Sequence, residues 1–330
     1  MENQQYNIAL IGAGTIGTAL GNILAEAGLE SILLLSIEHQ VVENINHTHI
    51  NSKYFPTLHL HPGLVATTDE RMLEHCKIIF LAIPSVVMID YLKKIRQHLP
   101  PDAILINLAK GFGFGNRTII ECLEEEFPNP LCTMKGPSFA REIINRLPTG
   151  FTLGYQNPDH ILQISNIFKN TNIHLDYSGD IRGVEILSIL KNIYAVVLGI
   201  VDAQFSSPNL RFLILTKAFR EMRKVLLAFG GQPDTLFNYC GYGDFTLTAL
   251  NDLSRNRTLG LLIGKGFFTE HVSHELVLEG KTAADVFYQE FSKTMNVGDH
   301  FPIMAELYRI FHTKYDISVF VKTLLNFPEA

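Results

Sequence analysis

Residues 7–17 read NIALIGAGTIG, an apolar run followed by three spaced glycines that open a second apolar segment. A strand that ends in such a turn and leads into a helix is typical of the first unit of a dinucleotide-binding sheet. Gly12 permits the tight turn, Gly14 lets the backbone approach a pyrophosphate, and Gly17 allows the helix to pack closely on the strand. A plain strand–helix turn can carry the same glycines, but the context favours a dinucleotide.

The residues around the first two expected strands bear on how the cofactor is held. The backbone amides of Thr15 and Ile16 begin the helix and would face the phosphate charge. An acidic residue at the end of the second strand would bind a ribose hydroxyl and repel a 2′-phosphate. Ser36 stands there instead, with Glu38 and His39 close behind it. Ser36 with His39 can accept a phosphate and Glu38 can bind the ribose, so the choice between NAD and NADP stays open, with a slight preference for NADP.

Apolar runs alternate with helical periodicity up to about residue 180. The expected strands are 7–11, 31–35, 77–83, 103–108, 131–134, 150–153 and 173–177, and the expected helices are 15–27, 85–98, 118–127 and 158–168. This alternation predicts a parallel, doubly wound sheet covered by helices on both faces.

Helical periodicity alone continues from there to the end of the chain. The expected helices are 184–201, 213–229, 260–265, 283–291, 302–312 and 319–325. We therefore predict a Rossmann-type α/β domain for dinucleotide binding at 1–180 and an all-helical substrate and catalytic domain at 181–330.

Composition restricts the class of protein further. Of the 330 residues, 47% are hydrophobic and 18% are charged, which is typical of a globular protein, and a net charge of −6 argues against a broad nucleic-acid surface. No apolar run reaches the length of a membrane span, and the N-terminus lacks the features of a signal peptide. The cysteines show no CxxC spacing, so we expect reduced, mostly buried thiols in a cytoplasmic protein; they are Cys76, Cys122, Cys132 and Cys240.

Two histidine pairs have a spacing that metal ligands can have. His47 with His49, and His59 with His61, would each share one face if the chain were extended there. No acidic or cysteine partner stands nearby to complete a site, so no metal is predicted.

A lysine interrupts the most apolar helix of the chain. Residues 183–201 are apolar almost all round, which predicts a buried helix, yet Lys191 and Asn192 stand in its middle. A buried lysine must lose its charge, find a partner or face a polar cavity. Lysines that reach the surface along their own stem are common, but a lysine with a lowered pKa is also a good proton donor and acceptor near neutral pH.

Several motifs occur in a fixed order along the chain. After GAGTIG come LAIPS at 81–85, AKG at 109–111, KGPSFARE at 135–142, GVE at 183–185, LKN at 190–192, GYGDFTLT at 241–248 and SRNR at 254–257. Together they resemble the bacterial NAD(P)-dependent glycerol-3-phosphate dehydrogenase family, over nearly the whole chain. The resemblance implies a two-domain fold like that of 6-phosphogluconate dehydrogenase.

The resemblance also implies roles for individual residues. Lys191 matches a catalytic lysine that gives a proton to the carbinol oxygen or removes it, and Lys110 matches a lysine that contacts substrate and cofactor. Asp244 and Thr248 match residues close to that lysine; four positions apart, they share a face if the segment is helical. The remaining matches line the substrate or the cofactor: Gly136, Ser138, Ala140, Asn192, Ser254, Arg255, Asn256, Val277 and Glu279.

These matches imply a direct hydride transfer between NAD(P) and glycerol 3-phosphate or dihydroxyacetone phosphate, supplying glycerol 3-phosphate for phospholipid synthesis. Arg255 next to the helix cap Ser254 would hold the substrate phosphate. A small phosphorylated triose is thus the expected partner, and the apolar helical half is compatible with a homodimer.

The chain departs from the family pattern at a few positions near the expected site. Phe212, Lys217 and Ala218 replace other residues, and Lys135 stands before Gly136 where a small residue is usual. Two alternatives therefore stay open: a related hydroxyacid or ketopantoate-type reductase, and a non-catalytic dinucleotide-binding paralogue.

Overall fold

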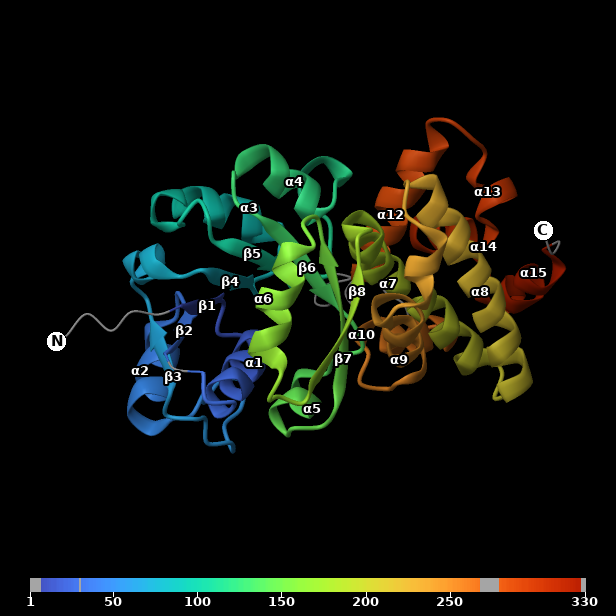
Figure 1. Cartoon of the computed structure of the whole chain (residues 1–330). Coiled ribbons are helices and arrows are strands. Elements are labelled where there is room, and N and C mark those ends of the chain that lie inside the picture. The colour runs from blue at the N-terminus through green and yellow to red at the C-terminus, as the bar shows by residue number, and fades with distance from the viewer. Residues whose placement is uncertain (1–6, 30, 268–278, 328–330) are drawn as a thin grey trace. The chain divides into compact units, whose positions relative to one another are not determined.

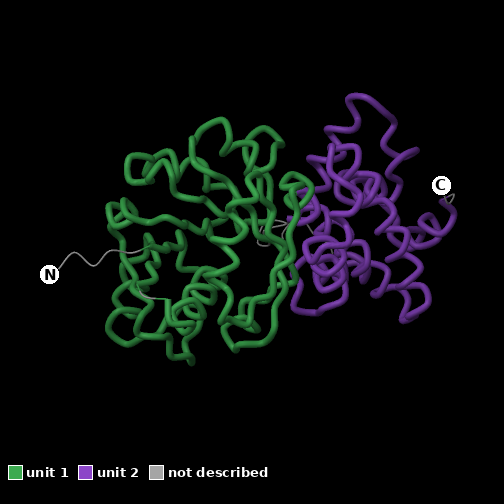
Figure 2. The backbone as a smooth tube through the Cα atoms, viewed as in Figure 1, with its two compact units in different colours: residues 1–185 green, residues 186–330 purple. Residues whose placement is uncertain are grey.

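The computed structural model describes residues 7–29, 31–267 and 279–327, shown in Figure 1. It divides into two compact units, residues 1–185 and 186–330 (Figure 2). The division falls inside a long helix, a few residues beyond the boundary expected near residue 180. A sheet with helices in the first unit and helices in the second agree with the predicted fold class.

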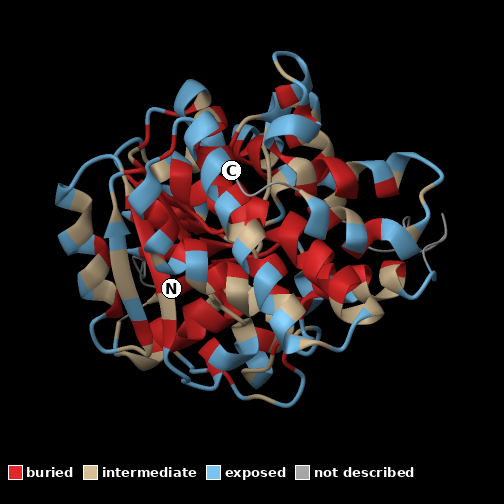
Figure 3. Ribbon diagram, turned by 90° about the vertical axis from the view of Figure 1, so that its right-hand side faces the viewer, coloured by how far each residue is buried: buried red, intermediate tan, exposed pale blue. Residues whose placement is uncertain are grey.

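The first unit is built on one eight-stranded sheet with the strand order β3-β2-β1-β4-β5-β6-β7-β8. Its strands are β1 (Ile8–Ile11), β2 (Ile32–Leu35), β3 (Leu64–Thr67), β4 (Ile78–Leu81), β5 (Ile104–Asn107), β6 (Leu131–Lys135), β7 (Thr149–Tyr155) and β8 (Ile173–Ser178). Buried residues, red in Figure 3, dominate the strands except for the edge strand β8, in which only Ile173 is buried. Strands covered on both faces are expected to be apolar almost throughout.

Helices cover both faces of this sheet. They are α1 (Thr15–Glu26), α2 (His39–Thr48), α3 (Ser85–Lys94), α4 (Ile119–Glu126), α5 (Ala140–Ile144) and α6 (Asp159–Phe168). Side chains of α1, α2, α5 and α6 form one apolar core with one face of the sheet. Side chains of α3 and α4 form a second core with the other face. Successive strand residues alternate between the cores, with Leu10 in the first and Ile11 in the second.

The predicted parallel sheet contains one antiparallel pair of strands. All pairings are parallel except that of β6 with β7, which is antiparallel. The chain turns back after β6 through the short α5 and re-enters the sheet from the same end. The connection, residues 136–148, contains α5 and does not cross to the opposite end of the sheet, as a parallel pairing would require.

Strand β3 and helix α2 are absent from the sequence prediction. Only Val41 and Ile45 of α2 are buried, so its apolar stripe is narrow. Residue His47 lies in this helix, and His49 ends it in the left-handed region at φ 54°. The two imidazoles therefore do not share the face of a strand, and the extended conformation considered for this pair is wrong.

The second unit is helical throughout its described residues. Its helices are α7 (Ile181–Gln204, of which residues 181–185 belong to the first unit), α8 (Pro208–Ala228), α9 (Asp244–Leu250), α10 (Arg255–Gly264), α12 (Glu279–Ser292), α13 (Val297–His300), α14 (Pro302–His312) and α15 (Phe320–Asn326). A single π-helical turn, Tyr239–Gly243, leads into α9.

Helix α7 is longer than the apolar runs expected from the sequence, none of which was predicted to reach the length of a membrane span. Among the described residues it alone is long and apolar enough to cross a membrane, and its apolar window is buried throughout. A helix that is apolar on all sides is typical of a protein core as well as of a membrane span.

Candidate functional site

The glycine turn has the geometry that its sequence predicts. Gly12 has φ +114°, and a Cβ there would lie 2.6 Å from the carbonyl oxygen of Ala82. A Cβ on Gly17 would lie 2.0 Å from the carbonyl oxygen of Gly12, so helix and turn pack without room for a side chain. At Gly14 a Cβ would meet nothing within 4 Å. The turn and the close packing are confirmed, and the open space beside Gly14 fits a diphosphate that approaches the backbone.

The start of α1 is open to an anion. Gly14 is the N-cap and offers no side-chain cap to the first turn, which contains Thr15 and Ile16. The loop is fixed from behind by the buried Asn51, whose Nδ2 donates to the carbonyl oxygen of Ala13 at 3.0 Å and to Oγ1 of Thr18 at 2.8 Å. Amides at a helix N-terminus are suited to a phosphate group. Asn51 lies far along the chain from the turn, and the sequence around it gives no signal of this role.

The residues after β2 form a small polar cluster. The Ser36 hydroxyl is buried and accepts a hydrogen bond from the backbone N–H of Glu38 at 3.1 Å. The Glu38 carboxylate pairs with Lys53 at 2.5 Å, and His39 is exposed. Lys53 brings a cation next to Glu38 that the local sequence did not reveal.

The ends of β5 and β6 bring three predicted substrate residues together. Lys110 Nζ donates to the carbonyl oxygen of Gly136 at 3.0 Å and lies 3.4 Å from Oγ of Ser138. A Cβ on Gly136 would lie 2.3 Å from the carbonyl oxygen of Gly150, so only glycine fits against β7. Ala140 begins α5 a few residues further on. Lys110, Gly136 and Ser138 are thus brought to one place, as the motifs predict.

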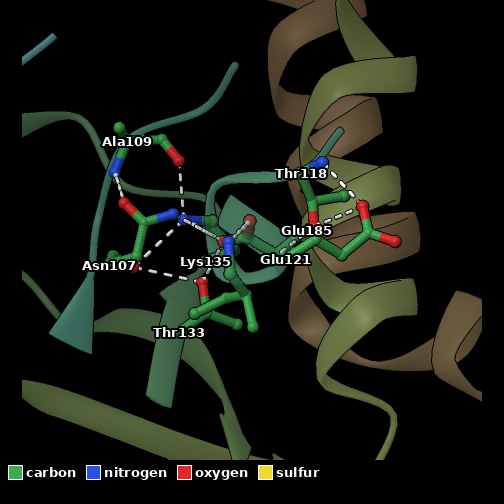
Figure 4. Close-up of polar contacts among 8 residues, drawn as sticks. Asn107, Ala109, Thr118, Glu121, Thr133, Lys135 and Glu185 are labelled. Carbon is green, nitrogen blue, oxygen red and sulfur yellow. Dashed lines mark hydrogen bonds and ion pairs between the residues drawn. The ribbon is translucent and has the colours of Figure 1, made fainter. Parts of the chain in front are cut away.

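A buried ion pair involves Lys135, the residue before Gly136 (Figure 4). Lys135 is fully buried, and its Nζ lies 3.2 Å from Oε1 of Glu185. The same oxygen accepts hydrogen bonds from Thr133 Oγ1 at 2.7 Å and Asn107 Nδ2 at 2.6 Å, and Oε2 accepts one from the Ile120 amide at 3.2 Å. Glu185 was not predicted as a partner, although a lone glutamate inside an apolar helix is a signal of the same kind as Lys191.

In the second unit, Lys191 is buried and paired. Its side chain projects from α7, the residue is 4% exposed, and Nζ lies 2.5 Å from Oδ1 of Asp244. Asp244 is itself buried and is the first residue of α9, which also contains Thr248. The segment is helical, so the predicted shared face of Asp244 and Thr248 is confirmed. A lysine can be buried in this apolar helix because the carboxylate of Asp244 pairs with its ammonium.

A second polar group joins α7, α10 and α12. Asn192 Oδ1 accepts from Asn256 Nδ2 at 3.0 Å, and Asn256 Oδ1 accepts from the Gly280 amide at 3.0 Å. Asn192 Nδ2 donates to Glu279 at 3.3 Å, and the mostly exposed Arg255 reaches Glu279 at 3.4 Å. The structure thus brings together four residues that the motifs proposed separately. Val277 lies outside the described residues.

The two arginines of the SRNR motif have different environments. Ser254 caps α10 by accepting from the Arg257 amide, as predicted. The side chain of Arg255 is 65% exposed, whereas that of Arg257 is 9% exposed and pairs with Asp202 at 2.5 Å. Arg257 also pairs with Asp252. Arg257 therefore holds the helix in place, and Arg255 is the arginine of the motif that a phosphate can reach.

Comparison with known proteins identifies the family. A model of the NAD-dependent glycerol-3-phosphate dehydrogenase N-terminus matches residues 7–161, and a model of the C-terminus of the same family matches residues 180–322. A glycerol-3-phosphate dehydrogenase [NAD(P)+] from Clostridium botulinum is 30% identical over 96% of both chains. The chain belongs to the NAD-dependent glycerol-3-phosphate dehydrogenase family.

Other glycerol-3-phosphate dehydrogenases are similar to most of the chain. The enzyme of that name from Methanothermobacter thermautotrophicus is 37% identical over 78% of this chain and 80% of its own. The crystal structure of glycerol-3-phosphate dehydrogenase from Coxiella burnetii superposes with a TM-score of 0.87, with 28% identity over 98% of this chain and 99% of that one. The family's fold is therefore retained over the full length.

The departures from the family pattern around residues 205–218 have ordinary structural environments. Lys217 Nζ donates to the carbonyl oxygens of Leu324 at 3.4 Å and Phe327 at 3.1 Å, next to the end of α15. Ala218 is fully buried, and Phe212 is 53% exposed on α8. A cation at a helix C-terminus is favourable, so Lys217 stabilises the C-terminal helix. Nothing in the structure explains Phe212.

Proposed function

We propose that this protein interconverts sn-glycerol 3-phosphate and dihydroxyacetone phosphate with NAD or NADP. The observation that carries the proposal is the Lys191–Asp244 pair, a buried ammonium held by a buried carboxylate within a chain of this family. A positioned acid–base group of this kind contributes about 10²–10⁴-fold to a proton-transfer step.

Lys191 is the proton donor in reduction and the proton acceptor in oxidation. Negative charge grows on the carbonyl oxygen of dihydroxyacetone phosphate as its C2 is reduced, and an ammonium stabilises that charge before it gives up a proton. Asp244 fixes the position of the ammonium, because a 2.5 Å charge-assisted contact restricts its rotation. Thr248 lies on the same face of α9 and adds a hydroxyl near this pair.

Lys110 is proposed to contact the substrate, together with Gly136 and Ser138. Its ammonium donates to the Gly136 carbonyl oxygen, which gives the charge a defined position at the ends of β5 and β6. In open α/β sheets, ligands bind beyond the carboxyl ends of the strands, and Lys110 follows β5 there.

The substrate phosphate is assigned to Arg255 and the start of α10. Arg255 is mostly exposed, and its neighbour Asn256 is fixed by Asn192 and by the Gly280 amide. A guanidinium at a helix N-terminus combines a bidentate fork with favourable backbone amides. Binding the phosphate away from the reacting carbon orients the substrate.

The dinucleotide is assigned to the first unit. Gly12, Gly14 and Gly17, with the open first turn of α1, would hold its diphosphate, and Ser36 and Glu38 lie at the ribose end. Ala140, Lys110, Arg255, Glu279 and Val277 are the further contacts proposed. When bound, the nicotinamide supplies the hydride.

The proposed setting is that of a cytoplasmic enzyme. All four cysteines are buried and none forms a disulfide, which suits a reducing compartment. Glycerol 3-phosphate is the backbone of phospholipids, so supply of this compound to lipid synthesis is the proposed role. A homodimer through the helical unit is proposed from its apolar content.

The decisive test is the oxidation of NADH and of NADPH by dihydroxyacetone phosphate, comparing the wild type with Lys191→Ala. We expect kcat to fall by about 10²–10⁴-fold with unchanged circular dichroism, because the proton donor is lost. Lys224→Ala, which removes an exposed lysine of α8, serves as the control and keeps wild-type turnover. Near-normal turnover of Lys191→Ala would contradict the role of Lys191.

The same assay separates the alternatives. A wild type that oxidises the cofactor with 2-ketoacids or ketopantoate and leaves dihydroxyacetone phosphate unchanged would be a reductase of another class. A wild type that binds NADH, as seen by its fluorescence, and turns over none of these substrates would be a binding protein.

A further inference from the structure

Two lysines link the end of β6 to the segment that follows β5. Lys135, the last residue of β6, directs its ammonium at the backbone of the segment after β5, donating to the carbonyl oxygens of Asn107 at 3.0 Å and Ala109 at 2.6 Å. Lys110, the next residue of that segment, donates back to the carbonyl oxygen of Gly136. Each lysine thus binds the backbone next to the other, and we name this arrangement the lysine brace (Figure 4 shows the Lys135 half).

The brace begins where the sheet stops supporting this segment. The ladder between β5 and β6 ends at the pair Asn107 and Thr133. Lys135 itself stays in register with Thr152 of β7. Beyond Asn107, the ammonium of Lys135 binds the carbonyl oxygen of Ala109, while the backbone of Lys135 is held by its pairing with β7. The ammonium therefore replaces ladder hydrogen bonds at the residue just before Lys110.

The charge of Lys135 is compensated inside the same cluster. Glu185 lies 3.2 Å from Nζ and is itself held by Thr133, Asn107 and the amide of Ile120. A buried ammonium without such a partner would be strongly destabilising. Glu185 thus allows a lysine to be enclosed here, and the Asn107 side chain, which also accepts from the Ala109 amide at 2.9 Å, ties the carboxylate to the same segment.

We propose that Lys135 is a positioning residue for Lys110. It fixes the backbone of Ala109 so that the Lys110 ammonium lies where the substrate is bound, without touching the substrate itself. The inference rests on the proposed contact of Lys110 with the substrate. A misplacement of about 1 Å in a binding group costs about 10²-fold in rate, so the effect on the reaction is measurable.

The test replaces the buried pair by neutral residues of similar size, as Lys135→Met/Glu185→Gln. We expect the KM for dihydroxyacetone phosphate to rise between about tenfold and hundredfold, with a smaller change in kcat, because Lys110 binds but Lys191 still donates the proton. Lys94→Met, an exposed lysine of α3, is the control and leaves KM unchanged. Lys135→Gln, which keeps a donor but loses the charge, provides a second variant.

A double-mutant cycle separates positioning from general stabilisation. If Lys135 acts through Lys110, the Lys135 substitution has little further effect on KM once Lys110→Met is present, whereas independent effects would multiply. Binding of NADH, measured by fluorescence, reports whether the first unit is folded in each variant.

Each outcome bears on one proposal. A wild type that does not act on dihydroxyacetone phosphate overturns the proposed function. An active wild type whose KM is unchanged in Lys135→Met/Glu185→Gln, or whose effects multiply in the cycle, overturns the positioning role. If neither Lys135 variant binds NADH, Lys135 serves the folding of the unit and the inference is also overturned.

Discussion

At the scale of single residues, Glu221 shows how burial acts on a charge. It lies on α8, fully enclosed, and accepts from the amides of Ile303 and Met304 and from the hydroxyl of Tyr194. Burial raises the pKa of Glu221 to about 7, although these three hydrogen bonds act in the opposite direction. Glu221 thereby caps the start of α14 with a carboxyl group that titrates near neutral pH.

This raised pKa predicts a pH-dependent stability. The unfolded carboxyl titrates near its model value of 4.5, so the folded state retains its proton up to about pH 7 and the unfolded state does not. The stabilisation of the folded state by the protonated Glu221 carboxyl is fully present below pH 4.5 and is lost as the pH rises through 7. Relative to Glu221→Gln, the wild type should lose up to about 3 kcal/mol of unfolding free energy between these limits. Urea denaturation at pH 5 and pH 8 measures it.

The control for this experiment is Glu290→Gln, a partly exposed glutamate of α12. Its unfolding free energy should follow the wild type across the same pH range. A wild type that gains stability relative to Glu221→Gln as the pH rises would show that the carboxylate is the preferred form.

Glu38 and Lys53 should act in opposite directions on the choice of cofactor. A carboxylate near the ribose repels a 2′-phosphate and a neighbouring ammonium attracts it. Glu38→Gln should therefore strengthen the binding of NADPH relative to NADH several-fold. Lys53→Met should weaken the binding of NADPH relative to NADH. Fluorescence titrations with both cofactors measure the shifts. Shifts of the same sign in both variants would show that the pair does not face the ribose.

At the scale of elements, α7 and α10 are joined by close packing and by a buried charge. A Cβ on Gly199 would lie 2.3 Å from the carbonyl oxygen of Arg257, and one on Gly260 would lie 2.1 Å from that of Val196. Asp202 of α7 accepts from Arg257 at 2.5 Å and from Arg211 of α8 at 2.6 Å. This carboxylate thus ties three helices, one of which carries the proposed phosphate-binding residues.

Removal of the carboxylate should be costly. Asp202→Ala leaves the guanidinium of Arg257 buried without its buried carboxylate partner. Breaking a buried pair in this way costs about 3–5 kcal/mol. Asp252 is the other partner of Arg257, and the Asp252 side chain is 87% exposed. The substitution Asp252→Ala should therefore cost less than about 1 kcal/mol. Thermal or urea unfolding of the two variants compares them directly. Equal losses would show that burial does not set the strength of these pairs.

At the scale of the whole molecule, the thiols are enclosed in the folded state. All four cysteines are buried, and burial raises the pKa of Cys76 and of Cys132 to about 12. The thiolate is the reactive form, so the native protein should react very slowly with Ellman's reagent at pH 8. In guanidinium chloride the full complement of four thiols should react at once. Fast reaction of the native protein would mean that the cores open readily.

The sequence predicted the parts of the fold that depend on neighbouring residues. Most of the predicted strands and helices lie within a few residues of their predicted bounds, because the spacing of apolar residues within a segment indicates its secondary structure. Helix α2, with two buried side chains, and the four-residue β3 carry too little of this signal. The strand β7 was predicted but its reversed direction was not, because strand direction depends on where the chain re-enters the sheet.

For the site, the sequence by itself determined the glycine turn, the lysine inside the apolar α7 and the capped start of α10. These follow from local chemistry: a turn that only glycine can make, a charge among apolar residues, and a serine before a helix. Only the tertiary structure decided which charges meet. Lys135 finds Glu185 fifty positions away along the chain, and Arg257 turns inward to Asp202 while Arg255 stays exposed. Such pairs are selected by the packing of distant elements, and the sequence near each residue holds no record of the partner.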